Sequence, residues 1–324
     1  MKLFLLKICA FLVAFSALLM LLYYLFPTRL EADNYLFAYN DKLSRLEQTD
    51  TPRVILVGGS NIAFGVSSEM IEDSLHCNVV NMGLHAGLGV RYTLRDYLRF
   101  IRPGDIVVFQ IEYSAFSSGG EISLDLADGL LAVVGRENIR KYTLPQLCRL
   151  AKIIPNRVMK NIPKALLDRN ADESSPNDSV YHYRRSGFNK WGDEASHWTL
   201  KTPSPGNINV QLGKKRSAPR ALKKSFVDWL AAEACAYEAA GAKVIFLPPV
   251  VCRSLFPLFY KQGIKECLAV AGRPYIVAPE DMVVDDSCSF DAEYHVNYAG
   301  VRQNTQRIIR ILRREISDSI PVRS

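Results

Sequence analysis

The stretch of sequence that decides the fold is Val54-Ile55-Leu56-Val57-Gly58-Gly59-Ser60-Asn61. Four apolar residues, three of them β-branched, run into two glycines and a serine. This pattern predicts a buried strand that ends in a tight turn. Ligands bind at the carboxyl ends of the strands in an open parallel sheet, so a hydroxyl at Ser60 is placed for chemistry. The alternative is an ordinary turn between a strand and a helix, in which the serine makes a local backbone hydrogen bond.

Further apolar runs predict the rest of a sheet. Strands are expected at Arg53 to Val57, Asn78 to Met82, Ile106 to Ile111, Lys243 to Leu247 and Tyr275 to Ala278. Helices are expected at Tyr92 to Ile101, Ala221 to Ala240, Leu255 to Ala271 and Asn297 to Ile316. Strands that alternate with helices across short connections imply parallel pairing and right-handed crossovers. The sequence therefore predicts an α/β fold with a parallel sheet and a long insertion after the third strand.

The N-terminus predicts a membrane anchor. Lys2 and Lys7 precede nineteen uncharged residues, Ile8 to Phe26, which is long enough to span a bilayer as a helix. A cleaved signal peptide is the alternative, but its apolar region is usually shorter and is followed by small residues at a cleavage site. We expect an uncleaved single-pass anchor in the cytoplasmic (inner) membrane, with the globular domain outside the cytoplasm.

Composition divides the chain further. The expected segments are an anchor at 1–27, a linker at 28–51, a first core part at 52–113, a helical and basic-aromatic insertion at 114–220, a second core part at 221–318 and a tail at 319–324. Between Pro176 and Ser225 ten Lys or Arg face three acidic residues, whereas the whole chain carries a net charge of +7. An anchor disfavours nucleic acid as the partner of this basic segment. The basic segment could instead be attracted to anionic lipid headgroups or to an acidic envelope polymer, or it could be a solvated loop.

The seven cysteines show no C-x-x-C pair and no metal-type spacing, so no metal site is expected. Cys9 lies within the anchor. The other six permit disulfides, for which Cys252 with Cys267 or Cys288 is one candidate pairing. Buried free thiols are the alternative, since several of these residues lie in apolar stretches.

A nucleophilic serine needs a general base, and the C-terminal part offers one. Asp291 and His295 flank a predicted loop that leads into the last helix. His295 would take the proton from Ser60, while Asp291 would orient the imidazole and stabilise its charged form. The alternative is a structural histidine that caps the last helix or packs under it.

Three blocks then occur in order on the expected elements: Gly58-Gly59-Ser60-Asn61, Asn81-Met82-Gly83 and the run from Phe290 to Gly300. In these blocks the chain resembles the SGNH (GDSL) hydrolase superfamily, most of all its membrane-anchored branch, which includes proteins that O-acetylate or D-alanylate envelope polymers. The resemblance covers residues 53–114 and 221–316 and implies a flavodoxin-like parallel sheet. It also implies that Ser60 is the nucleophile and that the N–H groups of Ser60 and Gly83 hold the oxyanion. The Asp-x-x-x-His spacing is one residue longer than the superfamily's usual one.

The third block departs from the superfamily more strongly. After the third strand the superfamily offers an asparagine to the oxyanion, but this chain reads Gln110-Ile111-Glu112-Tyr113-Ser114. A carboxylate there would oppose the oxyanion unless it were protonated or turned away. Ser114 or Asn61 would then substitute as a donor. Glu112 could instead bind substrate hydroxyls or pair with Arg91.

Two further parts of the sequence, a histidine and an aromatic segment, are open to more than one interpretation. His85, just past the second block, would contact substrate, orient Glu112 or be purely structural. The segment from Ser186 to Trp198 mixes aromatic and charged residues in a way that suits stacking on sugar rings, or its aromatics tuck into the domain.

We therefore expect an SGNH-like serine esterase or O-acyltransferase that acts on an envelope glycan or acylated polymer. It would use Ser60, His295 and Asp291 and need no cofactor or metal, and a membrane-bound acyltransferase is a candidate partner. The alternative is a catalytically degenerate relative that binds glycan or assists such an acyltransferase. The glycine turn is a poor phosphate site, because the lysine of a P-loop is missing.

Overall fold

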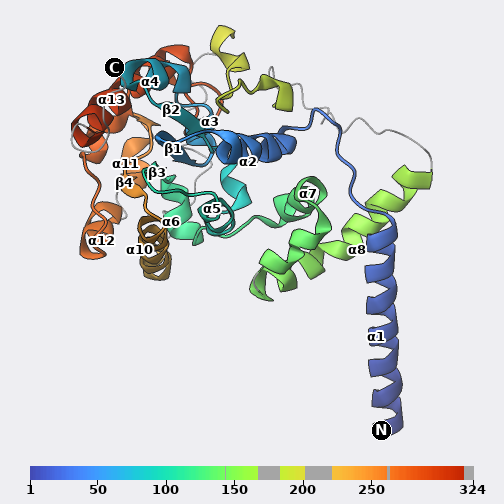
Figure 1. Cartoon of the computed structure of the whole chain (residues 1–324). Coiled ribbons are helices and arrows are strands. Elements are labelled where there is room, and N and C mark those ends of the chain that lie inside the picture. The colour runs from blue at the N-terminus through green and yellow to red at the C-terminus, as the bar shows by residue number, and fades with distance from the viewer. Residues whose placement is uncertain (143, 167–182, 201–220, 261–262, 317–324) are drawn as a thin grey trace. The chain divides into compact units, whose positions relative to one another are not determined.

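The computed structural model describes residues 1–142, 144–166, 183–200, 221–260 and 263–316. The chain divides into two compact units (Figure 1). One comprises Met1–Asn34 and Ser123–His182, and the other comprises Tyr35–Ile122 and Tyr183–Ser324. We call them the anchor unit and the α/β unit. The basic run at 201–220 lies outside the described residues.

The α/β unit is built on a four-stranded, fully parallel sheet in the order β2-β1-β3-β4. Its strands are β1 (Arg53–Gly58), β2 (Asn78–Asn81), β3 (Ile106–Gln110) and β4 (Lys243–Phe246). These are the first four predicted strands, to within one residue at their ends. The strand predicted at Tyr275 to Ala278 is wrong: this segment is irregular and makes one backbone bond to the sheet, from Ile276 N to Phe246 O at 3.2 Å. A separate two-stranded parallel pair joins β5 (Val251–Cys252) to β6 (Val283–Val284).

Helices follow or precede the strands along the chain. In the α/β unit they are α2 (Ala38–Gln48), α3 (Ser60–Ala63), α4 (Ser68–Leu75), α5 (Val90–Leu98), α6 (Tyr113–Ser118), α10 (Lys224–Ala239), α11 (Phe256–Tyr260), α12 (Ile264–Val270) and α13 (Tyr298–Ile316). Short 3-10 turns lie at Tyr35–Phe37, Ala86–Leu88, Arg185–Gly187, Ser196–Thr199, Pro279–Met282 and Asp286–Cys288. The helix predicted over 255–271 is therefore two helices, α11 and α12.

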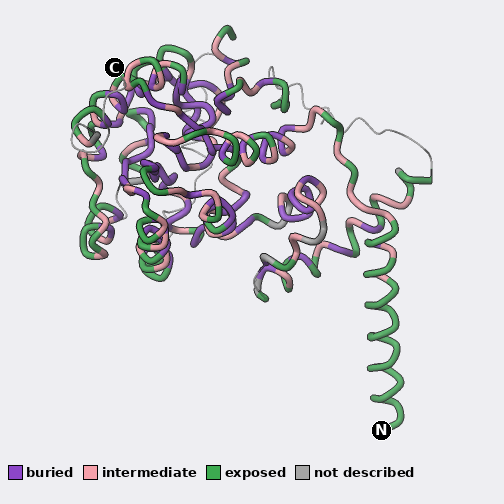
Figure 2. The backbone as a smooth tube through the Cα atoms, viewed as in Figure 1, coloured by how far each residue is buried: buried purple, intermediate pink, exposed green. Residues whose placement is uncertain are grey.

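Both faces of the sheet are covered, as its continuous apolar strands require. On one face the strands pack with α4 and α13 through a cluster that includes Val54, Val108 and Ile308. On the other face Phe109 meets the rings of Tyr237 and Phe246, at centroid distances of 5.3 Å each. Figure 2 shows the strands as the buried centre of this unit.

Segment 28–51, expected as a linker, contributes α2 to the α/β unit. Tyr39 and Leu46 on this helix are fully buried. The Lys42 Nζ donates to the carbonyl of Asn81 at 3.0 Å and to that of Gly192. Burial lowers the pKa of Lys42 to about 7, against the opposing charges of nearby carboxylates. This helix therefore braces the end of β2.

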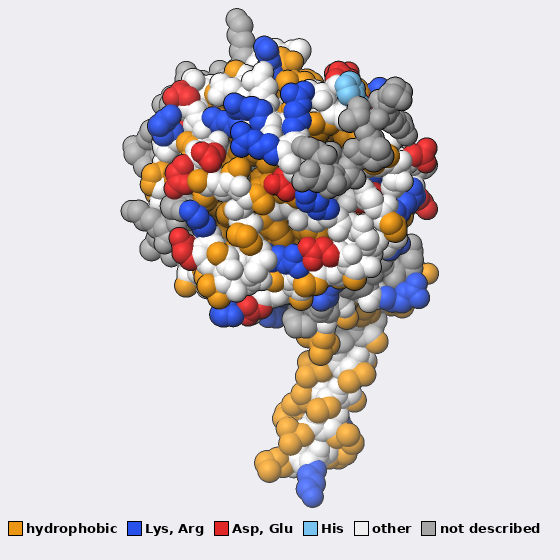
Figure 3. Space-filling view, turned by 60° about the vertical axis from the view of Figure 1, so that its left-hand side comes forward, with side chains coloured by type: hydrophobic (Ala, Val, Ile, Leu, Met, Phe, Trp, Pro, Cys, Tyr) orange, Lys and Arg blue, Asp and Glu red, His pale blue; other side chains and the backbone are white. Residues whose placement is uncertain are grey.

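The anchor unit contains α1 (Lys2–Leu25), α7 (Leu124–Val134), a 3-10 turn (Arg136–Lys141) and α8 (Leu144–Leu166). Among the described residues, α1 is the one helix long and apolar enough to cross a membrane. Almost all of it is exposed (Figure 2). Figure 3 shows apolar side chains along its whole length and a basic group at its far end. An N-terminal helix of this kind is either a membrane anchor or a signal sequence.

All seven cysteines lie in described residues, and all are free thiols in the structure. Cys252 and Cys288 are buried among apolar side chains that include Val250 and Val301. The pairing of Cys252 with Cys267 or Cys288 is thus not formed. Burial raises the pKa of the Cys288 thiol, as expected for an inert buried thiol.

Candidate active site

Ser60 lies where the sequence places it, at the turn that follows β1. Gly58 ends the strand and Ser60 begins the short helix α3. Glycine at position 59 leaves room for the Glu112 carboxyl group, since a Cβ there would lie 2.5 Å from Glu112 Oε1. Asn61 is fully buried: its Oδ1 accepts from Gly59 N at 2.9 Å and its Nδ2 donates to Gln110 O at 2.8 Å. The Asn61 side chain therefore fixes the turn and is not free to bind a ligand.

Glu112 follows β3 and lies against this turn. Its Oε1 accepts two hydrogen bonds, from Ser60 Oγ and from Asn61 N, both at 3.2 Å. Its Oε2 has no hydrogen-bond partner among the described residues. Burial raises the pKa of Glu112, while the bond from Asn61 and the charge of His295 oppose that rise. This environment favours the neutral acid more than water does.

His295 and Asp291 form the pair that the sequence predicts. The His295 Nδ1 lies 2.7 Å from Asp291 Oδ1. Phe64, at the end of α3, stacks on the imidazole with a centroid distance of 4.0 Å and an angle of 5° between the rings. Because Nδ1 is held by the carboxylate, Nε2 is left as the proton acceptor.

Tyr183 completes this pair, and nothing in the sequence pointed to it. Its hydroxyl donates to Asp291 Oδ2 at 2.6 Å and lies 3.3 Å from His295 Nδ1. Partial burial would raise the pKa of Asp291, but the hydrogen bonds from His295 and Tyr183 and the charge of His295 outweigh it and hold that pKa below its usual range. Asp291 therefore stays ionised beside the histidine.

The two halves of the site line one pocket of about 270 Å³. Its lining residues are Tyr35, Ser60, Phe64, His85, Glu112, Ser114, Tyr183, Ala292, Glu293, Tyr294 and His295. Of the predicted site residues, Ser60, Glu112, Ser114, His85 and His295 line the pocket, and Asp291 supports His295 from behind. Among the described residues, however, no hydrogen bond joins Ser60 to His295; the Ser60 hydroxyl bonds to Glu112.

Gly83 does not line the pocket. Its N–H donates to Asn81 Oδ1 at 2.8 Å, and a Cβ at this position would lie 2.5 Å from Ile62. In this conformation the Gly83 N–H is therefore bonded to Asn81 and does not point into the pocket as the oxyanion donor that the resemblance implies. The Asn61 N–H is likewise engaged, with Glu112. A carboxyl group thus occupies the amide donor of the residue that follows Ser60.

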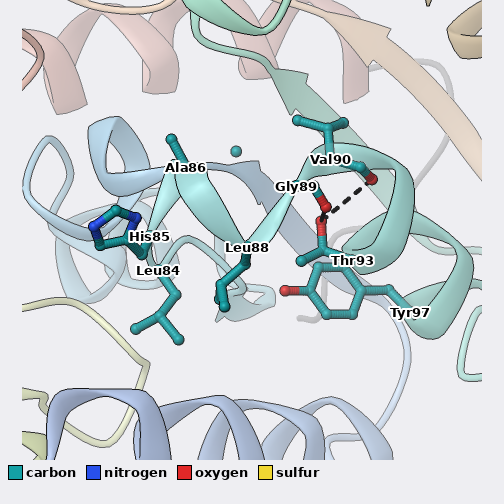
Figure 4. Close-up of a pocket in the computed structure, with 9 residues that line it drawn as sticks. Leu84, His85, Ala86, Leu88, Gly89, Val90, Thr93 and Tyr97 are labelled. Atoms are coloured by element: carbon teal, nitrogen blue, oxygen red, sulfur yellow. Dashed lines mark hydrogen bonds between the residues drawn. The ribbon is translucent and has the colours of Figure 1, made fainter. Parts of the chain in front are cut away.

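His85 lies at the edge of two cavities. Its Nδ1 accepts from Gly87 N at 2.9 Å, and its ring reaches the site pocket. On the other side it borders a cavity of about 10 Å³, the volume of a single water, next to Leu88, Thr93 and Tyr97 (Figure 4). Glu112 pairs with neither His85 nor Arg91; the Nε of Arg91 donates to Gly119 O at 2.8 Å, with Glu121 3.4 Å away.

The aromatic segment from Ser186 to Trp198 tucks into the domain. His197 is fully buried, with Nδ1 2.8 Å from Glu194 Oε2 and Nε2 3.0 Å from Val296 O. Trp191 is only 8% exposed. Asp193 is fully buried and accepts from the amide N of Ser68 at 2.8 Å. This segment braces the loop that carries His295, so the sugar-stacking alternative has no support here.

Comparison with known proteins adds no assignment: no family model matches the chain, and no curated protein matches it.

Proposed function

We propose that this chain is a membrane-anchored serine esterase or O-acyltransferase with an SGNH-like, flavodoxin-like core. Its substrate would be an O-acyl group on an envelope glycan or acylated polymer, met outside the cytoplasm. One observation carries the proposal: Ser60 and His295, which are far apart in the sequence, line one pocket, and Asp291 holds the imidazole of His295. A hydroxyl, an imidazole and a carboxylate gathered in this way are the parts of an acyl-transfer triad.

The proposed reaction begins when the Ser60 hydroxyl turns from Glu112 to His295 Nε2. Catalytic hydrogen bonds are often absent in unliganded enzymes and form with substrate. Ser60 Oγ then bonds to the acyl carbon while its proton passes to His295. The ester C–O bond breaks and the leaving alkoxide takes that proton. Water or an acceptor hydroxyl next attacks the acyl-serine, giving up its proton through His295, and Ser60 is restored.

Glu112 acts in this scheme as a neutral carboxylic acid. Its Oε1 accepts from Ser60 and Asn61, whereas a proton on Oε2 can be donated into the pocket. A buried carboxylic acid kept neutral is an effective donor to a developing oxyanion. This role would replace the asparagine that the SGNH superfamily has at the third block.

Full-length protein in detergent micelles provides the test. The wild type is expected to hydrolyse p-nitrophenyl acetate and to react at Ser60 with a fluorophosphonate. Ser60→Ala is expected to lose both activities. An absence of turnover and of labelling in the folded wild type, or equal turnover in Ser60→Ala, would reject the enzyme proposal.

The position of Glu112 also favours a second candidate, a non-catalytic relative that binds glycan or assists a membrane acyltransferase. An ionised Glu112 held by Asn61 N–H would exclude an oxyanion from that donor. This candidate predicts that Ser60→Ala restores the phenotype of a deletion strain as well as the wild-type gene does. The enzyme proposal predicts that Ser60→Ala fails to do so.

A further inference from the structure

Helix α8 of the anchor unit packs across the C-terminal turns of α1. Tyr23 joins Ile154 and Val158 in a small apolar cluster, with Leu19, Leu22 and Ile162 at its edge. Polar contacts surround this cluster. The Tyr23 hydroxyl donates to Asp128 Oδ1 at 2.6 Å, and Arg157 Nε lies 3.2 Å from Asp128 Oδ2. These contacts fix α8 at one end of the apolar helix.

The point of attachment is at the depth of a membrane interface. The 24 residues of α1 have a length of about 36 Å at 1.5 Å per residue, a little more than the ~30 Å hydrocarbon core of a bilayer. The last turns of α1 therefore emerge at the headgroup level when the helix spans. Tyr23 lies there, where tyrosine is commonly found in membrane proteins.

Beside this cluster, α8 also carries apolar side chains that are exposed. These residues are three, four or seven positions apart, which places them on one stripe of the helix. They are Leu144, Cys148, Ala151, Pro155, Met159 and Leu166. The large side chains are strongly exposed, Leu144 at 73%, Met159 at 76% and Leu166 at 72%. We call this surface the α8 stripe.

Basic side chains flank the α8 stripe. Arg149, Lys152 and Lys160 are exposed beside it, and α8 contains five Lys or Arg and no acidic residue. A helix with one apolar stripe and a basic border has the composition of helices that lie in a membrane interface. Lysine and arginine near such a surface are attracted to anionic headgroups.

We propose that α8 lies in the interface of the bilayer that α1 enters, with the α8 stripe in contact with acyl chains. The bilayer is the occupant that the position favours, because α8 is held at the end of the spanning helix. Arg149, Lys152 and Lys160 then face the anionic lipid headgroups. The helix works as a second membrane contact that limits the tilt of α1, independently of any chemistry at Ser60.

The chain carries its own probe site for a test. Cys148 lies in the α8 stripe, and the other thiols that are not buried are the exposed Cys9 and Cys235 and the half-buried Cys267. Replacing these three with serine leaves Cys148 for labelling with the fluorophore NBD. The matched control keeps Cys235 on α10 and replaces Cys9, Cys148 and Cys267 with serine. Both full-length proteins are reconstituted into phosphatidylcholine vesicles that contain phosphatidylglycerol.

The expected result is loss of NBD intensity at Cys148 with doxyl-labelled lipid and no loss with aqueous iodide. The label at Cys235 is expected to show the reverse. Quenching of the Cys148 label by iodide would overturn the proposal, because the α8 stripe would then face water. Shielding from both quenchers would also overturn it, because another part of the protein or a second copy would then cover the stripe.

A charge variant provides the second arm. In the Cys148 background, Lys152→Glu with Lys160→Glu is expected to reduce lipid quenching in the vesicles that contain phosphatidylglycerol. Thermal unfolding of this variant confirms that it is folded. Unchanged lipid quenching in the folded variant would show that the basic border does not face anionic headgroups and would contradict that part of the proposal.

Discussion

At Glu112 a buried carboxyl group has two donors on one oxygen and the pocket beside the other. Its neutral form is favoured by burial and is lost as the pH rises through its raised pKa. Activity that depends on the neutral acid should therefore decline on the alkaline side. In Glu112→Gln the side-chain amide still donates a hydrogen bond, and it does not ionise as the pH rises.

The first prediction follows from this difference. The ratio of kcat/KM for Glu112→Gln to that of the wild type is expected to increase with pH in p-nitrophenyl acetate hydrolysis. His85, Glu293 and His295 also line the pocket, but they are present in both proteins, so their contributions largely cancel in the ratio. Glu112→Ala removes the donor and is expected to cost ~10²–10³ in kcat. A ratio that stays constant with pH would show that the ionisation of Glu112 does not matter.

Tyr183 is a positioning residue, since it acts on Asp291 and His295. Removing its hydroxyl in Tyr183→Phe loses a bond to a charged group, worth ~1.5–3 kcal/mol, so kcat is expected to fall by about 10- to 100-fold. The pKa of Asp291 should rise, so the acid limb of the kcat/KM profile should move to higher pH. Tyr298→Phe, at an exposed tyrosine on α13, is the control. An unmoved acid limb would count against this role.

Some residues of the candidate site could be predicted from the sequence, and others could not. Ser60, Asp291 and His295 were predictable, because a glycine turn after an apolar strand and a histidine near a carboxylate are local patterns. The contacts of Glu112 with Asn61 and of Tyr183 with Asp291 were not predictable, because they join segments that are 51 and 108 residues apart. Such contacts depend on side-chain packing that no local pattern encodes.

At the scale of elements, a buried ion pair links the start of β1 to the turn before β3. The Arg53 Nε lies 2.8 Å from Asp105 Oδ1, with both side chains fully buried. Asp105→Asn would leave the guanidinium buried without its counter-charge. It is expected to lower the free energy of unfolding by about 3–5 kcal/mol in urea titrations.

The matched control is Asp228→Asn, which breaks the exposed pair with Lys224 on α10. An exposed pair contributes ~0–1 kcal/mol, so this variant should unfold almost as the wild type does. Equal effects of the two substitutions would contradict the account of how the sheet is held.

The strands were easier to predict from the sequence than the breaks within helices. The four main strands were found because each is a short apolar run ending at glycine, proline or a polar residue. The run at Tyr275 to Ala278 is equally apolar, but it makes one backbone bond to the strand beside it and forms no ladder. The helix predicted over 255–271 was not continuous: α12 begins after Gly263, which has a positive φ of 64°. Periodicity does not register such a break.

At the scale of the whole molecule, the N-terminal helix decides where the chain works. We expect the mature protein to keep α1, because Tyr23 is bonded to Asp128 and packs with α8. A C-terminally tagged protein expressed in cells should remain in the membrane pellet after alkaline carbonate extraction. Its intact mass should include the N-terminal residues. A soluble product that lacks α1 would identify the helix as a signal sequence.

The central claim is that Ser60 and His295, distant in sequence, act together on an acyl group. The most direct measurement is intact-mass and peptide analysis of full-length protein quenched in acid during turnover of p-nitrophenyl acetate. The account predicts an acetyl group on Ser60 in the wild type and a strongly reduced amount in His295→Ala. A folded wild type with no acetyl adduct on Ser60, or the same adduct in His295→Ala, would contradict it.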